Sequence, residues 1–185
     1  MPKKSSVKKD VFSWVVTIGV AILIAFLFRT YVAGNFIVSG ISMMPNFHNG
    51  DRLFINKMDR GINKLKDGDV IVFRYSSTQD YIKRIIGMPG DTISYKQGNL
   101  YRNSHKVAEP YLNAYKKKYG RRGFTIDFSL AGLTGHSKVP KNELWIMGDN
   151  RKKSYDSRFF KFVSVHRVIG KVELRYWPWN RLHVY

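Results

Sequence analysis

Two short stretches of the sequence hold residues that could form a nucleophile and its base. Ser42 lies in SGISMMPNFHNGD, between Gly40 and a Met-Met-Pro turn, shortly after the apolar run FIV. A serine hydroxyl acts as a nucleophile when a neighbouring group accepts its proton. Lys83, in DYIKRIIGMPGD, could be that group if desolvation keeps its amine neutral. The alternatives are an ordinary turn serine and a surface lysine on an edge strand.

The segment around Lys83 has the composition of a β-strand. Side chains alternate between the two faces of a strand, so Lys83 shares a face with Tyr81 and Ile85. Arg84 points to the opposite face with Ile82. The lysine is therefore flanked by apolar side chains, while the neighbouring cation is directed away from it.

A histidine could also be the base that accepts the proton of Ser42. None of the five lies in a distinctive motif, and four lie beside lysine, arginine or polar loop residues, where a surface position is expected. A Ser-His-Asp triad is not excluded by counting. The candidates are His48, His105, His136, His166 and His183.

The N-terminus predicts a membrane anchor. The stretch MPKKSSVKKD carries four lysines, and residues 11–28 then contain no charge. Eighteen helical residues cover about 27 Å, close to the hydrocarbon thickness of a bilayer. Arg29 suits the far interface, where its guanidinium can reach water. The lysine cluster favours a cytoplasmic N-terminus.

We therefore predict a cytoplasmic basic tail (1–10), a transmembrane anchor (11–33) and an extracytoplasmic domain (34–185). The alternative is a cleaved signal peptide. Its apolar core would usually be shorter, and Tyr31 is a poor residue three positions before a cut after Ala33.

The rest of the chain predicts a mainly β fold. Short segments rich in β-branched and aromatic residues, such as DVIVFRY and RVIGKVELRYW, alternate with turn signals such as KDGD and MPGD. No helical periodicity of useful length appears after residue 33. We expect a compact β-barrel or sandwich domain behind one N-terminal transmembrane helix. The basic stretch 114–123 is expected to be an exposed loop between strands.

Composition narrows the classes of function. The chain has 185 residues and a net charge of +19, which favours an anionic neighbour such as nucleic acid, acidic lipid or cell wall. It has no cysteine, which excludes a disulfide framework and a cysteine nucleophile and makes a structural zinc site improbable.

Four motifs in order behind a single anchor resemble the type I signal peptidases of the Gram-positive type. These are GISMMPNFHNGD, GDVIVF, YIKRIIGMPGD and GDNRKKSYDSR. The family consists of membrane-anchored Ser-Lys proteases that remove signal peptides from exported preproteins. The resemblance implies signal peptides and membrane lipid as partners, no nucleic acid, and no metal or organic cofactor.

The resemblance also implies roles for individual residues. Ser42 matches the nucleophile and Lys83 the general base, while Ser154 matches a serine whose hydroxyl orients the lysine amine. Four further positions match residues that support the site through hydrogen bonds and ion pairs: Asp149, Asp156, Arg158 and Arg84.

Two positions depart from the family pattern. Some members use a serine hydroxyl two residues before the nucleophile as an oxyanion donor, and here that position is Gly40. The oxyanion must then be stabilised by the Ser42 N–H and by a donor other than residue 40. Ser39 has the wrong parity for that role in an extended chain. Lys161 stands where the family usually has glycine.

Signal peptides present small residues at the first and third positions before the cut. An extended substrate could pair as an added strand against 36–38 and 81–83. The expected pocket walls, each of which could equally be ordinary core, are Phe36, Val38, Met43, Tyr81 and Ile82.

Two other functions account for part of the sequence. Self-cleaving Ser-Lys repressors share the chemistry, but here a membrane anchor replaces their DNA-binding domain. A membrane-tethered module that binds a polyanion through 116–122 would explain the charge. It would leave the pairing of Ser42, Lys83 and Ser154 without a purpose.

Overall fold

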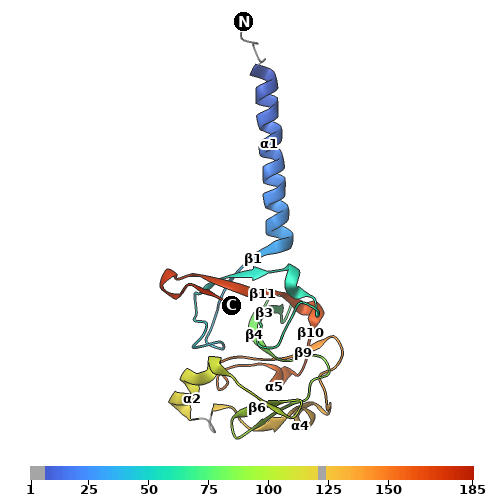
Figure 1. Cartoon of the computed structure of the whole chain (residues 1–185), viewed down its shortest axis with the longest axis vertical. Helices are drawn as coiled ribbons and strands as arrows, with labels where there is room; N and C mark the ends of the chain where they lie inside the picture. The colour runs from blue at the N-terminus through green and yellow to red at the C-terminus, as the bar shows by residue number, and fades with distance from the viewer. Residues whose placement is uncertain (1–6, 121–123) are drawn as a thin grey trace.

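A long N-terminal helix stands away from a β domain (Figure 1). The computed structural model describes residues 7–120 and 124–185. Helix α1 (Val7–Leu27) continues as a π-helical turn, η1 (Phe28–Val32), and leads directly into the first strand. The predicted basic tail lies mostly outside the described residues.

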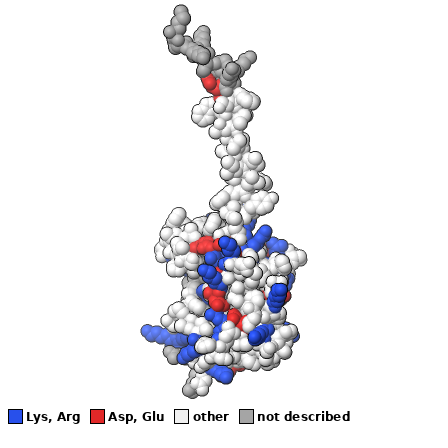
Figure 2. Space-filling view, turned by 45° about the vertical axis from the view of Figure 1, so that its right-hand side comes forward, with Lys and Arg blue, Asp and Glu red and all other residues white. Residues whose placement is uncertain are grey.

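The helix has the properties expected of the predicted anchor. Residues Asp10–Val32 are long and apolar enough to cross a bilayer, and their side chains are not buried in the protein. Figure 2 shows an uncharged surface along this helix and clusters of Lys and Arg on the domain. An exposed apolar helix of this length is typical of a membrane-spanning segment. The apolar stretch Asp10–Val32 coincides with the predicted segment 11–33 within a residue at each end, and its crossing of a membrane stays a prediction.

An eight-stranded antiparallel sheet carries most of the domain. Its strand order is β1-β2-β11-β3-β4-β9-β10, and β12 pairs with β11. The strands are β1 (Ala33–Ile37), β2 (Arg52–Asn56), β3 (Val70–Arg74), β4 (Asp80–Gly87), β9 (Glu143–Met147), β10 (Val163–Ser164), β11 (Val168–Trp177) and β12 (His183–Val184).

A four-stranded sheet lies at the end of the domain far from the helix (Figure 1). Its order is β7-β6-β5-β8. The strands are β5 (Ile93–Lys96), β6 (Asn99–Arg102), β7 (His105–Val107) and β8 (Phe128–Ser129). The prediction of a mainly β domain behind one apolar helix is confirmed.

Helices in the domain are short. They are α2 (Asn113–Tyr119), α4 (Leu130–Thr134), α5 (Ser157–Phe160) and the 3-10 turns η2 (Met58–Arg60), η3 (Pro110–Leu112), η4 (Val165–Arg167) and η5 (Trp179–Arg181).

The prediction of a loop at 114–123 is wrong over most of its length, because α2 occupies it. Three lysines in the last turn of α2 lie at the negative, C-terminal end of the helix dipole. Gly120, at φ +77°, ends the helix. Residues 121–123 lie outside the described residues.

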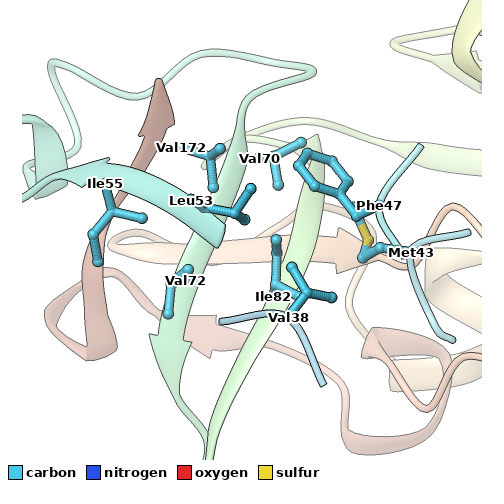
Figure 3. Packing of buried hydrophobic residues seen from close by; sticks show 9 residues of the cluster. All are labelled: Val38, Met43, Phe47, Leu53, Ile55, Val70, Val72, Ile82 and Val172. Atoms are coloured by element: carbon cyan, nitrogen blue, oxygen red, sulfur yellow. The ribbon is translucent and has the colours of Figure 1, made fainter. Parts of the chain in front are cut away.

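Three apolar clusters form the core, and one of them holds the segment after β1. In Figure 3, Val38, Met43 and Phe47 of that segment lie against side chains of the large sheet. Val38 and Met43 are 2% and 1% exposed. The complete cluster is Val38, Met43, Phe47, Leu53, Ile55, Val70, Val72, Ile82 and Val172. The chain on either side of Ser42 is thereby fixed to the sheet.

The backbone conformation at Lys161 explains why the family usually has glycine at this position. Lys161 follows α5 with φ +67° and ψ −123°, a conformation that glycine adopts without steric cost and other residues rarely do. Such backbone strain costs on the order of 1–3 kcal/mol.

We predict that Lys161→Gly raises the free energy of unfolding by about 1 kcal/mol, the relieved strain less the entropy that glycine adds to the unfolded chain. Thermal unfolding of the full chain in detergent measures the change. Lys161→Ala is the matched control, since it removes the same side chain but keeps a Cβ. An equal gain in both variants would show that the side chain, not the backbone, is the source.

Candidate active site

Ser42 lies on a tight segment held from two sides. Gly40 has φ +90°, which glycine adopts without steric cost, and no atom outside the adjacent residues lies within 4 Å of where a Cβ would be. The chain therefore turns here without steric conflict. Asn150 binds the segment from the loop after β9: its N–H donates to the Ser42 carbonyl oxygen (2.9 Å), and its side-chain amide donates to the Ile41 carbonyl oxygen (3.0 Å). Within the described chain, no group accepts a hydrogen bond from the Ser42 N–H.

Gly148 allows this close approach. A Cβ on Gly148 would overlap the Ser154 side chain and lie 2.5 Å from the Ser42 carbonyl oxygen. Only a residue without a side chain leaves room for both groups.

Lys83 directs its amine at the Ser42 hydroxyl. Nζ lies 2.9 Å from Ser42 Oγ and donates to the Ile82 carbonyl oxygen at 3.0 Å. Lys83 is only 3% exposed, and its Nζ lies 5.2 Å from the centre of the Tyr81 ring. Ser42 and Lys83, which are 41 residues apart in the sequence, are thus brought into hydrogen-bond contact.

Burial lowers the pKa of Lys83 from its ordinary value of 10.5 to about 8. The negative charges of Asp156 and Asp149 act in the opposite direction, but desolvation is the larger effect. The neutral amine required of a base is therefore accessible near pH 8.

The two carboxylates pair with arginines, as the sequence predicts. Arg84 donates to Asp149 through Nε (2.9 Å) and Nη2 (2.7 Å), and the Asn46 amide donates to the same carboxylate (2.7 Å). Arg158 donates to Asp156 through Nε (2.8 Å) and Nη2 (2.9 Å). Bidentate pairing fixes both carboxylates and partly neutralises them, so neither forms an ion pair with Lys83.

The expected hydrogen bond between Ser154 and Lys83 is not formed. Ser154 is 5% exposed, and its Oγ has no hydrogen-bond partner among the described residues. The hydroxyl lies against Gly148, in space that a Cβ on that residue would occupy. A buried unpaired hydroxyl costs free energy and marks a place where another group can bind.

Three of the histidines have other hydrogen-bond partners. The His48 ring bonds to Arg181, while burial and the Arg181 charge lower its pKa. The rings of His105 and His136 contact the Asn103 and Thr134 carbonyl oxygens. In the described part of the chain no histidine ring hydrogen-bonds to Ser42, whereas the Lys83 amine does.

A cleft of about 400 Å³ opens over Ser42 and Lys83. Of the five predicted wall residues, Phe36, Tyr81 and Ile82 line it. Val38 and Met43 do not; they belong to the core cluster below. The remaining lining residues are Ile37, Ser39, Gly40, Ile41, Asp80, Lys153 and Tyr155.

The sequence did not identify Lys153 and Tyr155 as lining residues. They lie in GDNRKKSYDSR on either side of Ser154, and the contact of this loop with the Ser42 segment brings them to the cleft.

A buried polar network behind the site was also missed. Arg151 is 2% exposed and donates to Glu109 at 2.6 Å and to the Tyr95 and Tyr111 hydroxyl groups. The Arg84 guanidinium lies 4.1 Å from the centre of the Tyr111 ring. This network ties the small sheet to the loop that carries Asp149. No cluster of three or more His, Asp or Glu side chains suited to a metal ion occurs in 7–120 or 124–185.

Comparison with known proteins gives a consistent family. The model of the family described as "Signal peptidase, peptidase S26" matches residues 11–177. The chain is 43% identical to signal peptidase I of Bacillus caldolyticus over 162 residues, 88% of this chain and 89% of that protein. It is 35% identical to signal peptidase IB of Staphylococcus aureus (strain COL) over 178 residues, 94% of this chain and 93% of that protein.

A solved structure is similar as well. The crystal structure of a signal peptidase I from Enterococcus faecalis V583 aligns with a TM-score of 0.56 and 36% sequence identity. The alignment covers 60% of this chain and 98% of that one.

The pair Arg84–Asp149 gives a test of how the site is supported. Its side chains are 9% and 1% exposed. We predict that Asp149→Asn lowers the free energy of unfolding by about 3 kcal/mol, because it leaves a buried guanidinium without its counter-charge. Urea unfolding of the full chain in detergent measures the loss.

The matched control is Asp80→Asn, which breaks the ion pair of Asp80 with Arg74, a pair with 32% and 53% exposed side chains. That change should cost less than about 1 kcal/mol. Similar losses in both variants would contradict the structural role given to Asp149.

Proposed function

The chain belongs to the peptidase S26 family of signal peptidases, and from this premise we propose that it is a membrane-anchored endopeptidase that cleaves signal peptides from exported preproteins with a Ser42–Lys83 dyad. The observation that carries the proposal is the 2.9 Å contact between Lys83 Nζ and Ser42 Oγ at the floor of an open cleft.

The proposed reaction begins with proton transfer. The lone pair of neutral Lys83 Nζ accepts the Ser42 hydroxyl proton as Oγ attacks the carbonyl carbon of the residue before the cut. The Ser42 N–H, which has no partner in the described chain, donates to the resulting oxyanion. The Lys83 ammonium then protonates the leaving amine. A water that gives its proton to Lys83 hydrolyses the acyl-enzyme and releases the signal peptide.

We assign Ser154 a positioning role. A neutral amine has two N–H groups and one lone pair. The Ile82 carbonyl oxygen accepts from one N–H, and the lone pair must face Ser42. The second N–H needs an acceptor, and Ser154 Oγ is a buried acceptor that has no other partner in the described chain. Its hydrogen bond would hold the lone pair toward the nucleophile during the reaction.

The sheet topology supports binding of the substrate as an added strand. Among the described residues, strand β1 pairs with β2 alone, and β4 pairs with β9 only from Arg84 onward. The free edges of β1 and of residues 80–83 both border the cleft. An extended peptide between them would hydrogen-bond to both edges, with alternate side chains directed at Phe36, Tyr81 and Ile82.

The anchor would place this cleft beside the membrane. Phe36 follows the end of the π-helical turn at Val32 by four residues, which is about 13 Å of extended chain. We propose a single-pass protein with a cytoplasmic N-terminus and an extracytoplasmic catalytic domain, so that the cleft lies where signal peptides leave the bilayer. Membrane lipid and signal peptides are its proposed partners.

We predict that Ser42→Ala and Lys83→Ala each lower cleavage of a preprotein by at least about 10³-fold without loss of the fold, because the two residues act as one unit. Detergent-solubilised protein, incubated with a preprotein whose cut is mapped by mass spectrometry, provides the assay.

His48→Ala is the control, since His48 contacts Arg181 and not Ser42. It should retain most of the activity. A folded but inactive His48 variant, or a Lys83 variant with normal activity, would reject the dyad.

The pH dependence follows from the lowered pKa of Lys83. As the pH rises through about 8, the neutral fraction of Lys83 increases and kcat/KM should rise with it. Initial rates at low substrate concentration between pH 5 and 10 measure this rise of kcat/KM with pH. A limb centred near pH 6.5, the ordinary range of histidine, would argue for a different base.

A further inference from the structure

A second cavity lies where the membrane helix meets the domain. Its volume is about 370 Å³, and its lining includes Arg29 and Lys57 together with apolar side chains of the large sheet, among them Ile55 and Ile169. Arg29 lies in the last turn of the candidate span Asp10–Val32. If the span crosses a bilayer, this cavity is at the depth of the lipid headgroups.

Lys57 is held in place at the end of the helix. Its Nζ donates to the Thr30 carbonyl oxygen at 3.1 Å and to the Arg29 carbonyl oxygen at 3.4 Å. A Cβ on Gly34 would lie 2.9 Å from Lys57 Cε, so the missing side chain lets the lysine lie across β1. A cation at this position also stabilises the negative end of the helix dipole.

The cavity carries an excess of positive charge. Arg29 is exposed and forms no ion pair within 7–120 and 124–185. The single acidic lining residue, Asp80, is already paired with Arg74. In Figure 2, Lys and Arg side chains lie on the domain close below the helix, with acidic side chains beside them. The cavity thus presents two cations and an apolar wall.

We propose that this cavity binds the phosphodiester headgroup of an anionic phospholipid from the membrane leaflet that faces the domain. The phosphate lies between Arg29 and Lys57, and the glycerol and first methylenes contact the apolar wall. A neutral peptide segment would provide no counter-charge for the two cations, whereas a lipid phosphate does. The lipid would thereby fix the angle between the helix and the domain, beside the cleft. The inference depends on the membrane topology proposed above but not on the proteolytic activity.

The test is a lipid titration of the full chain in detergent, followed by native mass spectrometry. Phosphatidylglycerol should bind more tightly than phosphatidylcholine. The double variant Arg29→Gln/Lys57→Gln should bind phosphatidylglycerol about 30-fold more weakly, because each cation near the lipid contributes about a factor of five. Lys57→Arg keeps the charge and should retain the affinity.

The matched control removes the same charge elsewhere. Lys96 and Lys106 lie on the small sheet, far from the helix. The double variant Lys96→Gln/Lys106→Gln should bind phosphatidylglycerol with an affinity within twofold of that of the unaltered protein. Equal loss in both double variants would mean that binding follows net charge alone and would overturn the proposal. If Arg29→Gln/Lys57→Gln does not fold, Arg29→Gln alone should still weaken binding about fivefold.

Two competitors distinguish other occupants. Displacement of the lipid by millimolar inorganic phosphate would indicate a site for a free anion. Displacement by a signal peptide resistant to cleavage would indicate a substrate site. Either result would overturn the proposal. The Ser42→Ala protein should bind lipid normally, so failure of this inference is distinguishable from failure of the proposed proteolysis.

Discussion

Burial of the Lys83 amine against the Ser42 hydroxyl is the interaction on which the rest of the site depends. A fall in the pKa of this lysine from 10.5 to about 8 costs the ammonium form about 3 kcal/mol. Because the folded-state pKa is below that of the unfolded chain, the fold carries this cost below pH 8 and is relieved of it as the pH rises toward 10.5. The core clusters and ion pairs must supply the compensating stability.

Several features prevent nearby charges from reversing the effect of burial on the pKa of Lys83. Arg84 and Arg158 engage the nearby carboxylates in bidentate pairs, so Asp149 and Asp156 raise the pKa of Lys83 only from a distance. Gly148 permits the loop after β9 to approach the nucleophile segment closely enough for Asn150 to bind it. The same loop contributes to the cleft, which couples the support of the base to the shape of the proposed substrate site.

The sequence predicted elements whose signal is local. The long N-terminal apolar helix, the alternation around Lys83 and the pairing of carboxylates with arginines all agree with the structure. Prediction from the sequence failed for residues whose positions depend on tertiary contacts. The sequence leaves Val38 and Met43 open as pocket wall or core, and the structure places both in the core against the sheet. Arg151 and Glu109 are 42 residues apart, so no local pattern reveals their buried pair. The Ser154 hydroxyl lacks the expected partner and lies instead against Gly148, a contact that depends on the loop after β9.

The titration of Lys83 itself tests the central claim most directly. The Lys83 side chain can be followed by NMR of its Cε and Nζ in the full chain in detergent, with the signal assigned by its loss in Lys83→Arg. We predict a pKa of about 8 for Lys83, well below its ordinary value of 10.5. A pKa of 10 or higher would show that the amine stays charged at physiological pH, and the Ser-Lys mechanism would have no base.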